Sequence, residues 1–225
     1  MYEFLTGPMA WLAFGVFFAG MILRVVLYIM GLDWRTDRVT YTRNILHGIR
    51  GALRSVVLWL VPFGTRSWRK NPAFTAVVFV FHILLLITPM FLQAHQILLN
   101  DAWGFRFYAL PEGIADLFTL GVILTAFLLI LRRISAPEVR RLTNMYDMLV
   151  IGIAVLPFIT GFFARHQTGS YSFWLYTHII SGEIMLMAVP FTKLSHFVLF
   201  FLSRAQLGMD YGIKRGGMKG KGMAW

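Results

Sequence analysis

Apolar residues gather in five long runs, each extensive enough to cross a lipid bilayer as a helix. The runs cover residues 8–30, 72–99, 111–131, 145–163 and 172–203. A spanning helix needs roughly 20 mainly apolar residues, and no long polar segment separates the runs. The pattern therefore predicts an all-α integral membrane protein with five transmembrane helices, which form a single domain over residues 1–211.

A shorter apolar pattern over residues 43–63 differs because basic residues recur within it. Arg43, His47, Arg50 and Arg54 follow one another at spacings of four, three and four residues, and aliphatic residues occupy the other side of the helical wheel. A helix with a basic face and an apolar face is typical of the membrane–water interface. We therefore expect an amphipathic interfacial helix between the first two spans, with His47 facing headgroups or water.

The distribution of charge predicts how the chain crosses the membrane. Hydrophobic residues make up 58% of the chain and charged residues 14%, with a formal net charge of +11. Basic residues concentrate in the first-to-second and third-to-fourth connections and in the Gly/Lys-rich segment 212–225, whereas the other two connections contain only Arg106 and Arg165. The positive-inside rule then places the N-terminus outside and the C-terminus in the cytoplasm. Because the positive residues flank apolar runs, they indicate topology and not nucleic-acid binding.

Four histidines within the second and fifth runs are the main candidates for chemistry: His82, His95, His178 and His196. Ionisable residues inside spans are costly and usually functional. Counting from the cytoplasmic ends at about 1.5 Å per residue places His82 and His196 roughly 15 and 12 Å deep, and His95 and His178 roughly 34 and 39 Å deep. The depths therefore pair His82 with His196 and His95 with His178.

Two imidazoles from two helices at one level can be the axial ligands of a six-coordinate haem, which transfers electrons and does not activate oxygen. The two pairs therefore predict two haems, and the absence of cysteine excludes thiolate-bound clusters in this chain. On a straight helix the eighteen residues from His178 to His196 make five turns, so both leave one face. The thirteen residues from His82 to His95 do not make a whole number of turns, so these two histidines would leave different faces of a straight helix. We therefore expect Pro89 or an early helix end to turn His95 back toward the bundle.

Three segments carry a resemblance to a known family. They are FHILLLITPMFLQAH in the second run, LRRISAPEVR after the third run and HIISGEIMLMAVPFTKLSH in the fifth. These segments resemble the membrane cytochrome b subunit, or gamma subunit, of respiratory nitrate reductase, and the similarity covers most of the chain. The chain looks closer to related subunits of the transmembrane redox complexes of sulfate-reducing bacteria. Its opening MYEFLTGP and its segment QLGMDYGIKRGG are similar to a family of membrane subunits from the high-molecular-mass cytochrome c complex.

The resemblance implies a subunit of a respiratory complex in a bacterial inner membrane, with a periplasmic N-terminus. It implies two b haems, one bound by His82 and His196 toward the cytoplasm and one by His95 and His178 toward the periplasm. The implied partners are membrane lipid, a cytoplasmic iron–sulfur subunit, other integral membrane subunits, a periplasmic multihaem cytochrome c and the menaquinone pool. In that setting the chain is an electron-transfer subunit and not a stand-alone enzyme.

The chain departs from the nitrate reductase pattern near its outer side. The histidines of the second run are more widely spaced, and the lysine that the family associates with the quinol site is absent near the start of the third run. Asp116, Glu112 and Arg106 are the polar residues that this chain has there. They are therefore the candidate quinone contacts.

Other polar residues within or near the spans have weaker functional indications. Glu183 follows His178 by five residues, and we expect it to hydrogen-bond to a neighbouring helix, with a proton relay or a quinol contact as the alternatives. Four basic residues near span ends are candidates to pair with haem propionates: Arg24, Lys193, Arg106 and Arg165. Two other functions remain open. The chain could be a haem-free scaffold or proton-conducting subunit, or a stand-alone quinol oxidoreductase.

Overall fold

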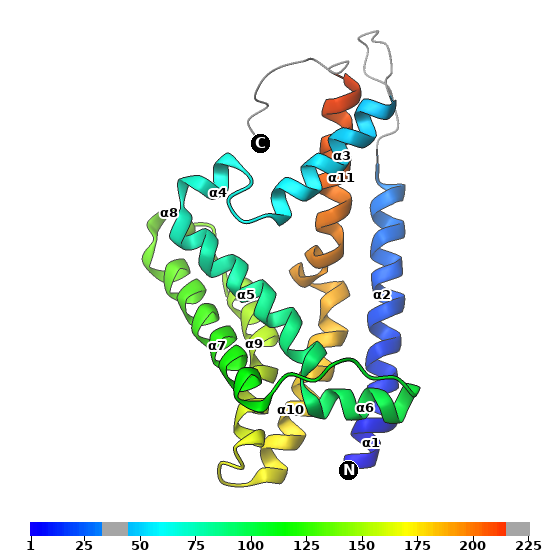
Figure 1. Ribbon diagram of the computed structural model, residues 1–225, viewed down its shortest axis with the longest axis vertical. Helices are drawn as coiled ribbons and strands as arrows, with labels where there is room; N and C mark the ends of the chain where they lie inside the picture. Colours follow the sequence, from blue (N-terminus) through cyan, green and yellow to red (C-terminus); the bar gives the residue numbers. More distant parts are fainter. Residues whose placement is uncertain (33–44, 215–225) are drawn as a thin grey trace. The chain divides into compact units, whose positions relative to one another are not determined.

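The computed structural model describes residues 1–32 and 45–214, and the described part is helical throughout (Figure 1). Helix accounts for 85% of the structure, and the described residues form no strand, so the predicted all-α class is confirmed. The elements are α1 (Tyr2–Phe4), η1 (Leu5–Met9), α2 (Ala10–Met30), α3 (Ile45–Leu60), α4 (Arg66–Lys70), α5 (Pro72–Phe91), α6 (Gln93–Trp103), α7 (Glu112–Ser135), α8 (Pro137–Arg140), α9 (Met145–Arg165), α10 (Tyr171–Ala188), η2 (Val189–Phe191), η3 (Lys193–Ser195) and α11 (His196–Lys214).

Five helical segments in the described residues are long and apolar enough to cross a membrane. They are Tyr2–Met30, Pro72–Phe91, Glu112–Ser135, Met145–Arg165 and Tyr171–Phe191. The first is continuous because α1, a π-helical turn at η1 and α2 follow one another without a gap, and the wider π turn contains Pro8, which has no N–H to donate. The prediction of five apolar spans is therefore confirmed by length and composition.

Two of the predicted spans are broken by the backbone. The second run was expected to continue to Leu99, but α5 ends at Phe91 and Leu92 is extended, with φ −71° and ψ 131°. One continuous helix over 172–203 is likewise wrong, because α10 ends at Ala188 and Thr192 is extended between two short 3-10 turns. The break contains Pro190, which cannot donate a backbone hydrogen bond, and the Thr192 hydroxyl caps the next turn through the Leu194 N–H at 3.2 Å. The five-turn spacing of His178 and His196 therefore does not apply.

The chain divides into two compact units. The first comprises residues 1–14 and 76–187 and contains α6 to α10 with most of α5. Its core lies where α5, α7 and α9 meet, formed by Phe81, Val122, Ala126, Val155 and Phe158. A Cβ on Gly121 of α7 would lie only 2.5 Å from the Cδ1 atom of Leu84, so this glycine allows α5 and α7 to approach closely.

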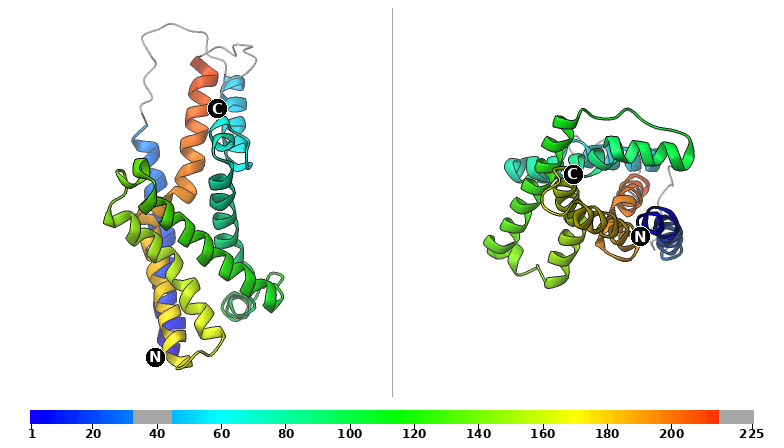
Figure 2. Two further views of the ribbon diagram at one scale, coloured as in Figure 1. Left: turned by 90° about the vertical axis from the view of Figure 1, so that its left-hand side faces the viewer. Right: turned by 90° about the horizontal axis from the view of Figure 1, so that it is seen from below.

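The second unit comprises residues 15–32, 45–75 and 188–214 of the described chain. Its main contact is between α3 and α11, which lie side by side (Figures 1 and 2). The contact face of α3 carries small residues, Gly48 and Ser55, which are buried. The Arg204 guanidinium of α11 lies over the Trp59 ring of α3, 4.1 Å from its centroid. Small residues and one cation–π contact thus hold this helix pair together.

The helix expected over 43–63 corresponds to α3, and its aliphatic side is exposed. Ile49, Leu53 and Val57 are each about half exposed, and Arg50 and Arg54 are exposed beside them. The membrane interface remains the predicted location of this face. Arg43, at the predicted helix start, lies outside the described residues, together with the rest of 33–44. Residues 215–225 of the predicted tail also lie outside them.

We expect Gly208→Ala to destabilise the α3–α11 pair. A Cβ at this position would lie 2.7 Å from the Gly51 carbonyl carbon and 2.7 Å from the Ser55 Cβ, so the helices would have to separate. Overpacking of this kind costs about 1–3 kcal/mol, which thermal unfolding of the detergent-solubilised chain measures. Gly15→Ala on α2 is the control, because nothing lies within 4 Å of the position that its added Cβ would take. Equal unfolding temperatures for the two variants would contradict the close packing.

Candidate cofactor-binding histidines

His95 and His178 come from different helices and face each other within the first unit. His95 lies on α6 and His178 on α10. Their ring centroids are 6.0 Å apart, and the planes of the two rings differ by only 15°. The structure therefore brings together the two histidines that depth counting paired.

The break between α5 and α6 is what directs His95 toward His178. Because the helix stops at Phe91, the last carbonyl groups of α5 lack the usual partners four residues later. The Pro89 carbonyl accepts the Nδ1–H of His95 at 2.8 Å, and the Phe91 carbonyl accepts the backbone N–H of Leu110 at 2.8 Å. The expectation that a helix end near His95 turns it back into the bundle is thus confirmed.

Gln96 holds this break in place from the neighbouring position. Its side chain is 3% exposed, its amide N–H₂ donates to the Met90 carbonyl, and its amide oxygen accepts the Phe107 N–H at 2.6 Å. One side chain therefore ties the end of α5 to the returning loop after α6. Figure 1 shows α6 turned away from the direction of α5.

His178 is held by α9 in a similar way. Its Nδ1–H donates to the Pro157 carbonyl at 2.8 Å. Opposite the ring lies Gly161, where a Cβ would come within 2.9 Å of the Cε1 and Nδ1 atoms of His178. Glycine is thus required at position 161 for the ring to occupy this position.

All four predicted histidines share one hydrogen-bond pattern. The Nδ1–H of His82 donates to the Val78 carbonyl at 2.7 Å, and that of His196 donates to the Lys193 carbonyl at 2.8 Å. The Nδ1–H groups of His95 and His178 donate in the same way to the Pro89 and Pro157 carbonyls. A backbone carbonyl can only accept, so Nδ1 carries the proton and Nε2 presents its lone pair. Metal-binding histidines are usually oriented in this way. His166 differs, because its Nε2 faces Asp116 at 3.6 Å.

The separation of the His95 and His178 rings matches the spacing expected when two imidazoles bind one metal atom through their Nε2 atoms. A metal lies about 2 Å from each ligating nitrogen, and each ring centroid lies roughly 1 Å further out, so the two centroids should be roughly 6 Å apart. The observed separation is 6.0 Å. Burial lowers the pKa of His95, which lies beyond the end of the α5 span, and the hydrogen bond to Pro89 opposes this shift. A lowered pKa favours the neutral ring that binds a metal.

His82 and His196 belong to different units, and both are exposed within the structure. His82 lies on α5 and its ring contacts Phe81 at a centroid distance of 5.3 Å. His196 is the first residue of α11, directly after the break at Thr192. Their pairing across the two units stays a prediction.

The candidate quinone contacts Glu112 and Asp116 form ion pairs with Arg165. The Arg165 Nε lies 2.6 Å from the Asp116 carboxylate, and its Nη2 lies 3.3 Å from that of Glu112. These contacts join the start of α7 to the end of α9, which gives all three residues a structural role. Arg106 is exposed on the loop after α6, and Arg24 donates to the Ser195 hydroxyl at 3.5 Å.

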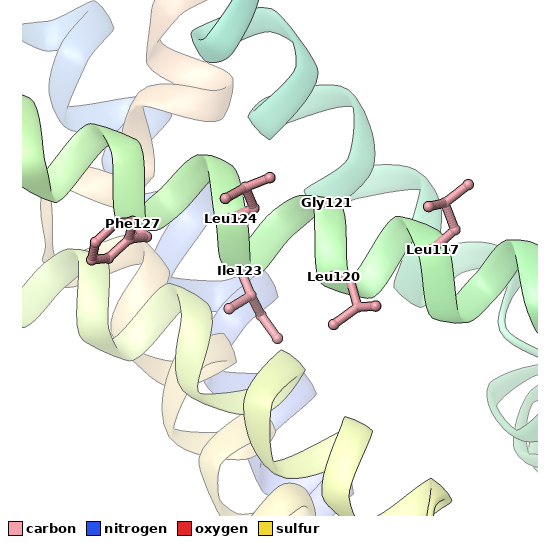
Figure 3. Close-up of a pocket in the computed structure, with 6 residues that line it drawn as sticks. All are labelled: Leu117, Leu120, Gly121, Ile123, Leu124 and Phe127. Atoms are coloured by element: carbon pink, nitrogen blue, oxygen red, sulfur yellow. The ribbon is translucent and has the colours of Figure 1, made fainter.

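Two further features concern the apolar surface and Glu183. Six residues of α7 line an open apolar hollow in the middle of this span (Figure 3), a surface suited to lipid acyl chains. They are Leu117, Leu120, Gly121, Ile123, Leu124 and Phe127.

The hydrogen bond expected for Glu183 is absent among the described residues, because neither carboxyl oxygen has a partner there.

The helices of the described residues, five of which are long and apolar enough to cross a bilayer, are those of a multi-pass helical membrane protein. The chain is 51% identical over 226 aligned positions to a protein of Nitratidesulfovibrio vulgaris strain Hildenborough, and the alignment covers 100% of both chains. The chain therefore belongs to the same family as this protein. No established family profile matches the sequence.

The sequence offered little indication of Gln96 and Gly161. Gln96 is one polar residue in an apolar run, and only the helix break at Leu92 shows what its amide can reach. Gly161 lies four residues after Pro157, a spacing that places the Pro157 carbonyl and the open glycine position on one face of α9. That spacing is the signal that could have identified the His178 contact surface.

We expect Gln96→Leu to loosen the connection between α5 and α6. The change leaves the Met90 carbonyl and the Phe107 N–H without their partner, and each unsatisfied buried group costs about 1–3 kcal/mol. Hydrogen exchange should therefore become faster at the Phe107 amide. Gln93→Leu is the matched control, because Gln93 is exposed at the start of α6. Unchanged Phe107 protection in the Gln96 variant would show that the side chain does not hold the break.

Proposed function

We propose that this chain is a di-haem b subunit of a multisubunit respiratory redox complex in a bacterial inner membrane. It carries electrons between a periplasmic multihaem cytochrome c or the menaquinone pool and a cytoplasmic iron–sulfur subunit. The observation that carries the proposal is the facing pair His95 and His178, with centroids 6.0 Å apart and Nδ1 atoms bonded to backbone carbonyls. The sequence resemblance to membrane cytochrome b subunits supports the same function.

In this proposal His95 and His178 hold one haem, and His82 and His196 hold the other. A haem bound by two imidazoles is a one-electron carrier with no open iron position. The protein contributes the orientation of the rings. The Pro89 and Pro157 carbonyls fix the tautomer of His95 and His178, and Gly161 leaves room for the second ring.

The basic connections support the proposed orientation and partners. Arg132 and Arg133 at the end of α7 and Arg140 and Arg141 after it form the third-to-fourth connection. By the positive-inside rule this side faces the cytoplasm. A positive surface there suits a cytoplasmic iron–sulfur subunit with an acidic face.

One observation favours a second candidate function. Glu183 is buried in a span without a hydrogen-bond partner among the described residues, as expected of a haem-free proton-conducting subunit. Bound haem separates the two candidates, because a proton path needs none. A stand-alone quinol oxidoreductase has less support, because Glu112 and Asp116 are engaged by Arg165.

We expect the purified full-length chain to show reduced b-type absorption bands and two haems per chain. His178→Ala should remove about half of the haem, because one axial ligand of one pair is lost. His95→Ala should remove the same half and therefore gives an independent check. His166→Ala is the control, because its ring contacts Asp116 and lies in no predicted pair. Wild-type protein without b-type bands would contradict the proposal and favour the proton-conducting subunit.

We expect Gly161→Ala to perturb the haem held by His178 without removing a ligand. The added methyl group would lie 2.9 Å from the His178 ring, which must shift or rotate. The variant should bind that haem more weakly, measured as a haem-to-protein ratio after extended washing in detergent. Gly152→Ala on the same helix is the matched control, because no atom lies within 4 Å of the added Cβ. If the two variants retain haem equally, the Gly161 contact has no role in the site.

A further inference from the structure

Glu183 lies deep within the last span with no partner for its charge. The span covers Tyr171–Phe191, so Glu183 is about 18 Å from one end and about 12 Å from the other at 1.5 Å per residue. The residue is 6% exposed, and both carboxyl oxygens are buried without a hydrogen-bond partner among the described residues. An ionised carboxylate is very costly in such a position, so the neutral acid is the stable form.

The other carboxylates near or within the spans are all satisfied or exposed. Asp147 is buried but completes a capping box with Asn144, accepting its backbone N–H at 3.0 Å. Glu112 and Asp116 pair with Arg165, and Glu3 is exposed. Glu183 thus differs from every other acid near these spans in the described chain, and helix packing alone does not account for it.

The elements that contact α10 in the first unit bring no charge to Glu183. Helix α9 contacts α10 through Thr160 with Ser181, 3.3 Å apart, and through the His178 hydrogen bond. The ionisable residues of α9 are confined to its ends: Tyr146, Asp147 and Arg165. Helix α6 brings His95 and Asp101, and α10 itself carries Tyr171, Tyr176 and His178. Among the described residues none of these forms an ion pair or hydrogen bond with Glu183.

We propose that Glu183 is a proton-binding site inside the membrane whose occupancy follows the charge at the His95–His178 site. The inference rests on the proposed function. When the oxidised site carries positive charge, Glu183 can release its proton. When one electron arrives from the redox partner, that charge is neutralised and the carboxylate takes one proton from a hydronium ion. For each electron, one O–H bond forms at Glu183 and one O–H bond of the hydronium ion breaks, which leaves a water molecule.

The distance along α10 is short enough for this coupling. Glu183 follows His178 by five residues, an axial rise of about 7.5 Å. At a separation of roughly 10 Å and an effective dielectric constant of about 20, one unit of charge changes proton affinity about tenfold. Ions in water would screen such a charge, but buried groups are screened much less.

Infrared and redox measurements on the full chain test the proposal with Glu183→Gln, which keeps the shape and removes the titrating group. The wild-type protein should show the carbonyl band of a protonated carboxylic acid, shifted in D₂O, and the variant should lack it. Redox titration should show a midpoint potential for the His95–His178 haem that falls as pH rises, with a weaker dependence in the variant. Glu112→Gln is the matched control, because Glu112 is paired with Arg165 near the surface.

The outcomes separate this inference from the proposed function. A carbonyl band that survives in Glu183→Gln, or is missing from the wild type, would overturn the proton site while leaving the haem assignment intact. The same pH dependence in the wild type and in Glu183→Gln would overturn the coupling. Protein without b-type bands would overturn the proposed function and the coupling together, whereas the infrared band would still report the protonation of Glu183.

Discussion

The arrangement of the first unit depends on hydrogen bonds between histidine side chains and backbone carbonyls. The Nδ1–H groups of His95 and His178 donate to the Pro89 and Pro157 carbonyls at 2.8 Å each. These bonds fix the tautomer, set the ring planes and leave both Nε2 atoms available to a ligand. If the bonds were lost, the rings could rotate, and their 15° alignment across two helices would not persist.

The apolar surroundings explain why these bonds matter. Inside a membrane, unsatisfied backbone and side-chain polar groups are expensive, so spans satisfy them locally. The buried hydroxyls of Thr88, Thr119, Thr125 and Thr160 follow this rule by donating to carbonyls four residues earlier at 2.6–2.8 Å. Gln96 obeys the same rule at the break after α5, where it uses both ends of its amide. Within residues 1–32 and 45–214, Glu183 is the buried carboxyl that has no such partner, which is why it calls for a functional explanation.

Much of this arrangement could be predicted from the sequence, because the length of an apolar run and the depth of a residue within it follow from the order of residues along the chain. Counting depth paired His95 with His178, and the structure brings those rings together. The break at Thr192 was missed because the apolar run resumes at His196–Leu202, so the polar residues Thr192, Lys193 and Ser195 were included in one long span. Gln96 and Gly161 were also missed, because their roles depend on which groups the folded backbone brings within reach.

The central claim is that His95 and His178 bind one metal between them, and electron paramagnetic resonance of the oxidised protein tests it most directly. The proposal predicts low-spin ferric signals typical of two axial imidazoles, from two haems with distinct surroundings. His95→Ala should remove one of the two signals and leave the other unchanged. A spectrum without low-spin ferric haem, or one that His95→Ala leaves intact, would contradict the claim.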